Sequence, residues 1–302
     1  MSNPAPLSRE ALLGHGAMAL FSALVAGSFA LGAKIAHLIE PAPLNALRFL
    51  VAACLMSTVA YLAGKASAET IARARRAPWR YGVLAFCMVT YFVLMFKALK
   101  TVSAVSTAAV FTLTPILSAG FGWLLLRQIT TPRIALGLSI GAVGALWVVF
   151  RADLGALLSL DLGYGEAIFF VGCAMHALYT PLVRKLNRGE PAILFTAGML
   201  IAGALMLLVM NASALWSIDW AGMPERFWLI LAYLSLVTTG FTFFLVQFAT
   251  MRLPASKVMA YTYVTPAWVI VWERGLGHPW PTIWIVLGVG VCCGALVLLL
   301  KA

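Results

Sequence analysis

Charged residues are scarce in this sequence of 302 residues. Asp, Glu, Lys and Arg make up 10% of it, whereas hydrophobic residues make up 63%. A water-soluble domain carries about 25% charged residues, because its surface must face water. So few charges exclude a soluble globular protein of this length and favour a protein whose surface faces lipid.

Residues suited to catalysis or metal binding are also few. The four histidines form no His-Glu-x-x-His motif, the five cysteines lie in apolar runs without metal-ligand spacing, and no Gly-x-x-x-x-Gly-Lys phosphate loop occurs. Asp153, Asp161 and Asp219 fall between apolar runs, whereas an intramembrane aspartyl enzyme needs its aspartates inside them. We therefore expect no enzyme, no metal and no cofactor. An intramembrane enzyme with an unrecognised motif is the alternative from another class.

Long apolar runs dominate the sequence. In lipid, the backbone must satisfy its own hydrogen bonds in helices or a closed barrel, and barrel strands alternate apolar with polar residues. The run 286–300 is apolar without interruption, so we predict an all-α membrane protein. The polar start 1–9 precedes a long run without an Ala-x-Ala site, which indicates a retained span. At about 20 residues a span, ten spans are expected at 12–36, 42–64, 79–99, 102–126, 132–151, 163–186, 191–211, 226–250, 254–276 and 280–300.

The net charge is +11, and the distribution of Lys and Arg along the sequence indicates how the chain is oriented in the membrane. With an even number of spans both termini share one side, and 14 of the 21 Lys and Arg residues fall on that side. The positive-inside rule then predicts cytoplasmic N- and C-termini, with the lipid bilayer as the main partner. The location that we expect is a bacterial inner membrane. No basic stretch is interleaved with aromatic residues as base stacking requires, so we expect no nucleic-acid partner.

The sequence also repeats itself. Glu40-Pro41-Ala42 matches Glu190-Pro191-Ala192 at an offset of 150, and Thr114-Pro115 matches Thr265-Pro266 at 151. We predict two five-helix repeats, residues 1–155 and 156–302. Because five is odd, the second repeat enters the membrane from the opposite face. Inverted repeats are a recurring design of secondary transporters, although duplication alone can also build a bundle.

Several stretches resemble a known family. The stretch from Ala98 to Val148, its counterpart from Leu253, and "PLNALRF" from Pro43 to Phe49 are similar to the drug/metabolite transporter superfamily, EamA type. Within that superfamily the aromatic-rich second half resembles the YddG-type amino-acid exporters. The resemblance implies export of amino acids, aromatic or hydrophobic ones, or of similar metabolites, by alternating access. A transporter of another amphipathic metabolite or drug is the alternative.

Aromatic, hydroxyl and methionine side chains within the spans are candidates for binding a small-molecule substrate. An amphipathic solute would suit such a cavity, whereas packing between helices is the alternative for each residue alone. His176 is the ionisable residue deepest in a span, and a charge there is costly enough to indicate function. The predicted binding residues are Tyr91, Met95, Thr107, Phe111, His176, Tyr179, Phe244, Gln247, Tyr261, Thr265 and Trp268.

Two further features concern motion and assembly. Pro115 and Pro266 lie at equivalent positions of the repeats, and each removes a backbone hydrogen bond, so we predict hinges there, with static kinks as the alternative. Small residues at Gly137, Gly141 and Gly144 allow close helix contact. Contact within the chain is expected, which gives a monomer. Contact between two copies, which gives a dimer, is the alternative.

Overall fold

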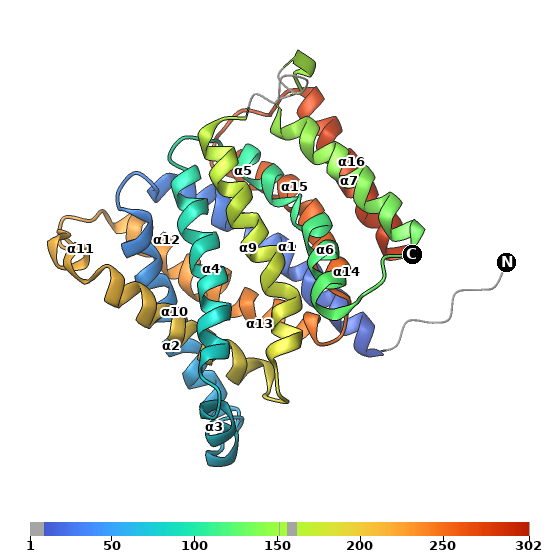
Figure 1. Cartoon of the computed structure of the whole chain (residues 1–302). Coiled ribbons are helices and arrows are strands. Elements are labelled where there is room, and N and C mark those ends of the chain that lie inside the picture. The colour runs from blue at the N-terminus through green and yellow to red at the C-terminus, as the bar shows by residue number, and fades with distance from the viewer. Residues whose placement is uncertain (1–8, 151, 156–161, 302) are drawn as a thin grey trace.

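The computed structural model describes residues 9–150, 152–155 and 162–301, and it is helical almost throughout (Figure 1). The described residues contain no strand, so the expected all-α fold is confirmed. In the first half the helices are α1 (Arg9–Ile35), α2 (Pro41–Leu62), α3 (Ala68–Arg75), α4 (Trp79–Ala98), α5 (Ala104–Phe111), α6 (Thr114–Leu126) and α7 (Pro132–Val149). In the second half they are α9 (Tyr164–Leu186), α10 (Ala192–Met210), α11 (Ala212–Ser217), α12 (Glu225–Ser235), the π-helical η1 (Leu236–Phe241), α13 (Thr242–Thr250), α14 (Ala255–Ala260), the 3₁₀ segment η2 (Tyr261–Val264), α15 (Thr265–Gly275) and α16 (Ile283–Lys301).

Nine helical segments of the described residues are long and apolar enough to cross a membrane, and each agrees with an expected span. The remaining expected span, 254–276, is helical over nearly its whole length but is divided into α14, η2 and α15. No single helix there reaches spanning length. The expected repeat boundary adjoins residues 156–161, which lie outside the described residues, as do residues 1–8 of the polar start.

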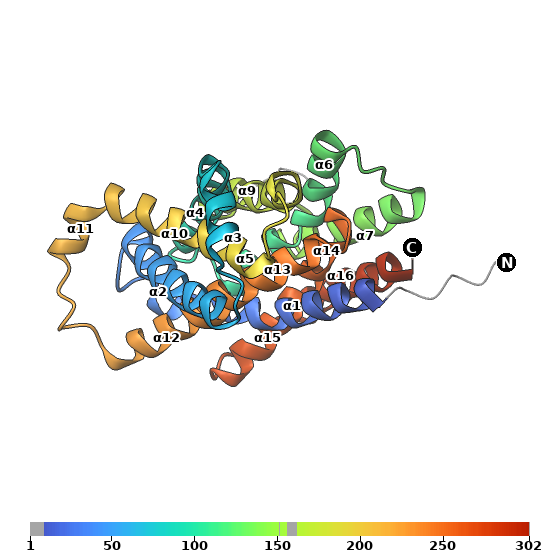
Figure 2. The same cartoon turned by 90° about the horizontal axis from the view of Figure 1, so that it is seen from below.

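Helices from the two halves of the chain pack in pairs. Helix α2 packs against α10, α7 against α16, α4 against α9, and α1 against α12 and α13. Figure 2 shows α2, α10 and α12 on one side of the bundle and α7 and α16 on the other, with α5 and α13 between them. Each half therefore fails to form a separate core, and the centre of the bundle is built from both.

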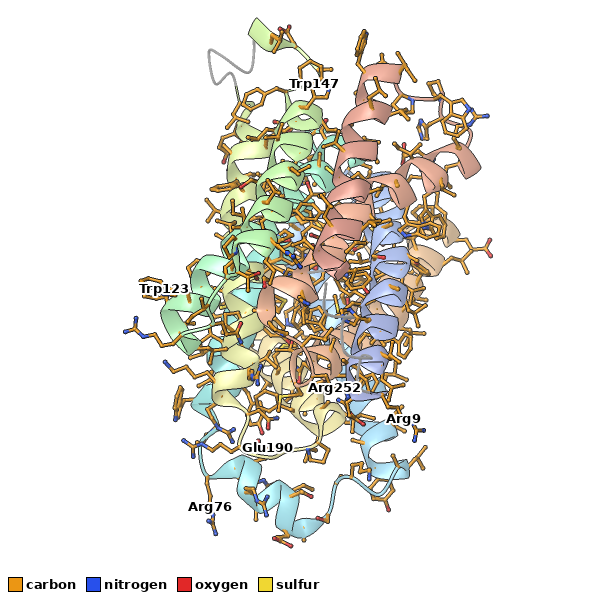
Figure 3. The ribbon with its side chains drawn as sticks, turned by 90° about the vertical axis from the view of Figure 1, so that its right-hand side faces the viewer. Arg9, Arg76, Trp123, Trp147, Glu190 and Arg252 are labelled. Carbon is orange, nitrogen blue, oxygen red and sulfur yellow. The ribbon has the colours of Figure 1, made fainter. Side chains whose placement is uncertain are left out.

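Three of the arginines lie at one end of the bundle. Arg9, Arg76 and Arg252 lie at one end together with Glu190, whereas Trp147 lies at the opposite end (Figure 3). We call the first of these the basic end. Helix α1 begins there, so the described start of the chain and these arginines share one side of the bundle.

Each of the two Thr-Pro sites begins a helix after a break, rather than kinking a continuous helix. Pro115 stands in the first turn of α6, after a turn that ends α5. A proline has no N–H to donate to the carbonyl four residues earlier, and the Thr114 hydroxyl donates to that Phe111 carbonyl at 2.7 Å. Pro266 stands in the first turn of α15, after η2, but the Thr265 hydroxyl makes no such hydrogen bond within the described residues. The Thr114 and Thr262 hydroxyl oxygens lie 3.1 Å apart, so the two breaks meet inside the bundle.

Small residues join α7 to α16 within the chain. A Cβ on Gly144 would stand 2.9 Å from the Gly288 carbonyl oxygen, and one on Gly141 would overlap the Tyr263 ring. The Tyr263 hydroxyl donates to the Leu138 carbonyl at 3.0 Å. The glycine face of α7 therefore makes intramolecular contacts, as small residues do in membrane helix pairs.

Candidate functional site

Aromatic rings from five helices meet inside the bundle. The Tyr91 and His176 ring centroids lie 4.6 Å apart, those of Phe111 and His176 5.2 Å, and those of Tyr91 and Phe111 5.7 Å. These separations are in the range at which aromatic pairs attract one another. We call the set the central cluster. Its members are Phe29, Tyr91, Phe92, Phe111, Phe169, His176, Tyr179 and Phe243.

A glycine explains how α4 and α9 approach closely enough to build this cluster. A Cβ on Gly172 would stand 3.3 Å from the Tyr91 carbonyl oxygen and 3.4 Å from the Leu94 Cβ. His176 follows Gly172 by one helical turn, so both lie on the same face of α9. The close backbone contact therefore places the His176 ring beside the Tyr91 ring.

Several buried polar atoms have no hydrogen-bond partner within the described residues. The Tyr91 hydroxyl, His176 Nδ1 and Gln247 Oε1 are three of them, and the Ser28 and Thr265 hydroxyls are two more. Buried polar groups in folded proteins nearly always have a partner, so each exception requires an explanation. A polar ligand entering the site would find unused donors and acceptors among aromatic rings.

A polar contact beside the central cluster joins α9 to α13. Gln247 Nε2 donates to the Tyr179 hydroxyl at 2.9 Å, and both side chains are buried. Phe243, one turn earlier on α13, stacks on Phe92 with centroids 5.6 Å apart. Helix α13 thus supplies a hydrogen-bonding group and an aromatic wall.

Most of the predicted binding residues are buried in the structure, although not all of them face the cluster. The Thr107 hydroxyl donates to the Ser103 carbonyl of its own helix at 2.8 Å. The Tyr261 hydroxyl lies 3.1 Å from His15 Nδ1, at a separate contact between α1 and η2. The buried ones are Tyr91, Met95, Thr107, Phe111, His176, Tyr179, Gln247, Tyr261 and Thr265.

Two predicted binding residues, Phe244 and Trp268, are not buried in the structure. Trp268 is 40% exposed, because the 3₁₀ turns of η2 advance about 120° per residue instead of 100°. A spacing of seven from Tyr261 therefore does not return to the same face. Phe244 stacks on Phe241, and its neighbour Phe243 takes the place in the cluster that we expected for it.

Arg48 is a site residue that the search for aromatic and hydroxyl groups missed. Its side chain is fully buried in α2, where Nη1 donates to Asn45 Oδ1 at 3.3 Å. Nη2 donates to the Thr239 hydroxyl at 2.9 Å and to the Thr238 hydroxyl at 3.3 Å. Both hydroxyls donate to the Leu234 carbonyl, an arrangement that the wide turn of η1 permits. The sequence feature that could have identified Arg48 is a charge inside the apolar run of an expected span.

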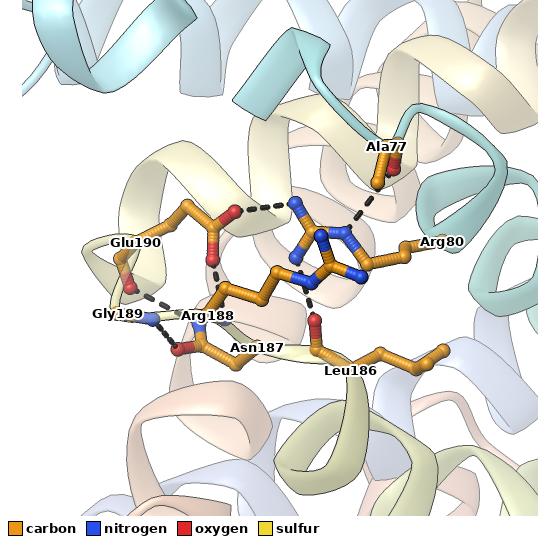
Figure 4. Close-up of polar contacts among 7 residues, drawn as sticks. All are labelled: Ala77, Arg80, Leu186, Asn187, Arg188, Gly189 and Glu190. Carbon is orange, nitrogen blue, oxygen red and sulfur yellow. Dashed lines mark hydrogen bonds and ion pairs between the residues drawn. The ribbon is translucent and has the colours of Figure 1, made fainter. Parts of the chain in front are cut away.

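Arg80 is also buried, although the count of Lys and Arg that gave the orientation assigned it to the cytoplasmic side. Its Nη2 donates to Glu190 Oε1 at 2.6 Å and its Nη1 to the Leu186 carbonyl at 2.6 Å (Figure 4). The Arg188 backbone N–H donates to Glu190 Oε2 at 2.7 Å. Burial raises the pKa of Glu190, but these hydrogen bonds outweigh it, so its pKa lies below the ordinary value. The contacts hold the α9–α10 connection against the start of α4.

The described residues contain no group of His, Cys, Asp and Glu that could hold a metal ion. One serine-hydrolase pattern, Gly-x-Ser-x-Gly, occurs at residues 137–141. An elbow of that type needs a sharp turn between a strand and a helix. Here the five residues lie inside α7, and the Ser139 side chain is exposed on its outer face. The pattern therefore does not form a nucleophile elbow.

Comparison with known proteins gives the family. The sequence profile of the EamA-like transporter family matches twice, at residues 13–150 and 163–301. The chain belongs to this family. It is therefore a multi-pass membrane protein and a transporter of the EamA type.

A curated relative and a solved structure are similar to the chain over most of its length. The uncharacterized transporter YyaM of Bacillus subtilis (strain 168) is 23% identical over 277 residues, which cover 91% of this chain and 90% of YyaM. A crystal structure of another protein superposes with a TM-score of 0.70 over 97% of this chain and 96% of that one, at 18% identity. At that identity the likeness shows the fold alone.

Proposed function

We propose that this EamA-type transporter exports amino acids, aromatic or hydrophobic ones, through the central cluster. The buried polar atoms without a partner, among them the Tyr91 hydroxyl and His176 Nδ1, carry the proposal. They lie among aromatic rings, as in a site for an amphipathic solute. Another amphipathic metabolite or drug is the alternative substrate class.

The proposed architecture is ten spans in two inverted five-helix repeats, residues 1–155 and 156–302. The two matches of one family profile, at 13–150 and 163–301, support it. The pairing of α2 with α10 and of α7 with α16 supports it as well, because these pairs join equivalent helices of the two repeats. Exchange of conformation between inverted copies would open the site to each side in turn. The breaks before Pro115 and Pro266 are the proposed hinges.

The proposed setting is a bacterial inner membrane, with the basic end in the cytoplasm. Arg9, Arg76 and Arg252 at that end support this orientation through the positive-inside rule. A cysteine at exposed Ser67, near the basic end, should resist an impermeant thiol reagent in intact cells. A cysteine at exposed Ala221, in the α11–α12 connection, should react. The reverse result would invert the orientation. We propose a monomer, since the glycine face of α7 is already occupied by α16.

The test of the substrate class is flux in proteoliposomes. The purified protein is reconstituted, the vesicles are loaded with radiolabelled phenylalanine, tryptophan, leucine or lysine, and efflux is measured with and without a proton gradient. Faster efflux of the aromatic and hydrophobic amino acids than from protein-free vesicles is the expected result. Absence of flux for every amino acid would overturn the amino-acid assignment, and flux of an unrelated drug instead would favour the alternative.

A further inference from the structure

Arg48 carries a positive charge deep in the bundle without an acidic partner. The ion pairs of the described residues involve Glu10, Glu40, Glu69, Glu190 and Glu273, and none of them includes Arg48. A buried ion without a counter-charge is costly unless hydrogen bonds or a ligand stabilise it. The protein supplies only part of that stabilisation.

The groups around the Arg48 guanidinium are neutral. Its hydrogen-bond acceptors among the described residues are one amide oxygen, of Asn45, and two hydroxyls, of Thr238 and Thr239. Its Cζ lies 4.2 Å from the Phe92 ring centroid and 5.2 Å from that of Phe96. Among the described residues, Nε has no hydrogen-bond partner. The free Nε–H can donate a charge-assisted hydrogen bond to a carboxylate oxygen.

One aromatic residue connects this charge to the central cluster. Phe92 lies beneath the Arg48 guanidinium, and its ring centroid is 4.8 Å from that of Tyr91. Phe243 stacks on the same ring. A small aromatic carboxylate at Arg48 could therefore extend its ring toward Tyr91 and His176. None of the eight residues of the central cluster carries a carboxylate that could bind an ammonium group in return.

We propose that Arg48 binds the carboxylate of the transported solute, and that the site selects aromatic carboxylates without requiring an amine. This proposal rests on transport through the central cluster and names the group that the site recognises. A guanidinium fixed by Asn45, Thr238 and Thr239 presents its remaining N–H groups in one orientation. The aromatic rings then select the rest of the solute by packing.

The test compares ligands that differ in one group. Thermal unfolding of the purified wild-type protein is measured with phenylalanine, with 3-phenylpropionate, which lacks the amine, and with phenethylamine, which lacks the carboxylate. The first two should raise the unfolding temperature, whereas phenethylamine should leave it unchanged. Equal stabilisation by phenethylamine would overturn the proposal, and so would equal stabilisation by added chloride, which would indicate a site for inorganic anions. This comparison uses the wild-type chain, so it does not depend on a variant that folds.

Variants then locate the binding group. Arg48→Gln should weaken the binding of 3-phenylpropionate by about 30-fold or more, because a buried charge pair loses one partner. Arg48→Lys should recover part of it. Arg252→Gln, which changes an arginine at the basic end, is the matched control and should bind normally. Normal binding by Arg48→Gln would overturn the assignment.

Flux measurements separate this proposal from the proposed function. Binding of 3-phenylpropionate without flux of any amino acid would remove the amino-acid assignment and leave the carboxylate site. Amino-acid flux that phenethylamine and 3-phenylpropionate inhibit equally would remove the carboxylate site and leave the amino-acid assignment.

Discussion

Arg80 and Glu190 form an ion pair whose side chains are both fully buried, with Nη2 and Oε1 2.6 Å apart. The pair joins the first turn of α4 to the connection between α9 and α10, which the repeat assigns to different halves of the chain. It lies at the basic end, near Arg76 (Figure 3). The two halves are therefore tied together at that end of the bundle.

The first prediction concerns the strength of this tie. Glu190→Gln removes the negative charge and leaves the Arg80 guanidinium buried without a counter-ion. Breaking a buried pair in this way costs about 3 kcal/mol. We expect a lower unfolding temperature in detergent, measured by intrinsic fluorescence or differential scanning calorimetry.

The repeat supplies a matched control for that variant. Glu40 matches Glu190 in sequence, but its ion pair with Lys100 is exposed, with 76% of the Glu40 side chain accessible. Exposed pairs contribute at most about 1 kcal/mol. Glu40→Gln should therefore leave the unfolding temperature nearly unchanged. Equal effects of the two variants would contradict a special role for the buried pair.

The second prediction concerns pH. The pKa of Glu190 is lower in the folded chain than its ordinary value of 4.5, because the hydrogen bonds from Arg80 and from the Arg188 backbone outweigh the effect of burial. A depressed carboxyl pKa stabilises the fold above the unfolded-state pKa, and this stabilisation is lost as pH falls through the folded-state pKa. The wild type should be more stable than Glu190→Gln at neutral pH, and the difference should shrink below about pH 4.5. A difference independent of pH would contradict ionisation as its source.

The spans could be predicted from the sequence because lipid enforces apolar runs of fixed length. The breaks could be predicted only in part. Proline marked where α6 and α15 begin, but nothing in the residue order indicated the 3₁₀ turn of η2 or the π-helix of η1. Those turns rotate every later side chain, which is why Trp268 faces outward and why Thr238 and Thr239 both reach Arg48.

The aromatic part of the candidate site could be predicted from residue type, whereas its charged part could not. Tyr91 and Phe111, two aromatic residues at mid-span in the sequence, are in ring contact in the structure. The count of Lys and Arg that gave the orientation assigned Arg48 and Arg80 to the two sides of the membrane, although both fall within expected spans, and both side chains are buried in the bundle. Whether such a side chain turns inward depends on partners from distant helices, such as Thr239 and Glu190, and those contacts are tertiary.

The third prediction uses two neighbours on α13. Phe243 packs in the central cluster, whereas Phe244 stacks on Phe241 and Phe248 outside it. Phe243→Leu should reduce flux of the aromatic substrate severalfold, because the solute loses an aromatic wall. Phe244→Leu should transport normally at equal expression. Radiolabelled efflux from proteoliposomes measures both, and the opposite ranking would place the substrate on the outer face of α13.

The fourth prediction separates binding from structure by comparing two tyrosines. The Tyr91 hydroxyl is buried without a hydrogen-bond partner, so Tyr91→Phe removes no hydrogen bond from the fold and should leave stability unchanged or slightly higher. The Tyr179 hydroxyl accepts from Gln247, so Tyr179→Phe should cost about 1 kcal/mol. Thermal unfolding of both variants measures the difference.

Flux measurements on the same two variants complete the argument. If the Tyr91 hydroxyl serves the solute, Tyr91→Phe lowers flux or raises the substrate concentration for half-maximal flux although the fold is unharmed. A packing residue would give the opposite combination, with stability lost and flux preserved. Full transport activity in Tyr91→Phe would mean that the unused hydroxyl does not contact the solute. His176 Nδ1, the other unpartnered group of the cluster, would then be the remaining candidate for that contact.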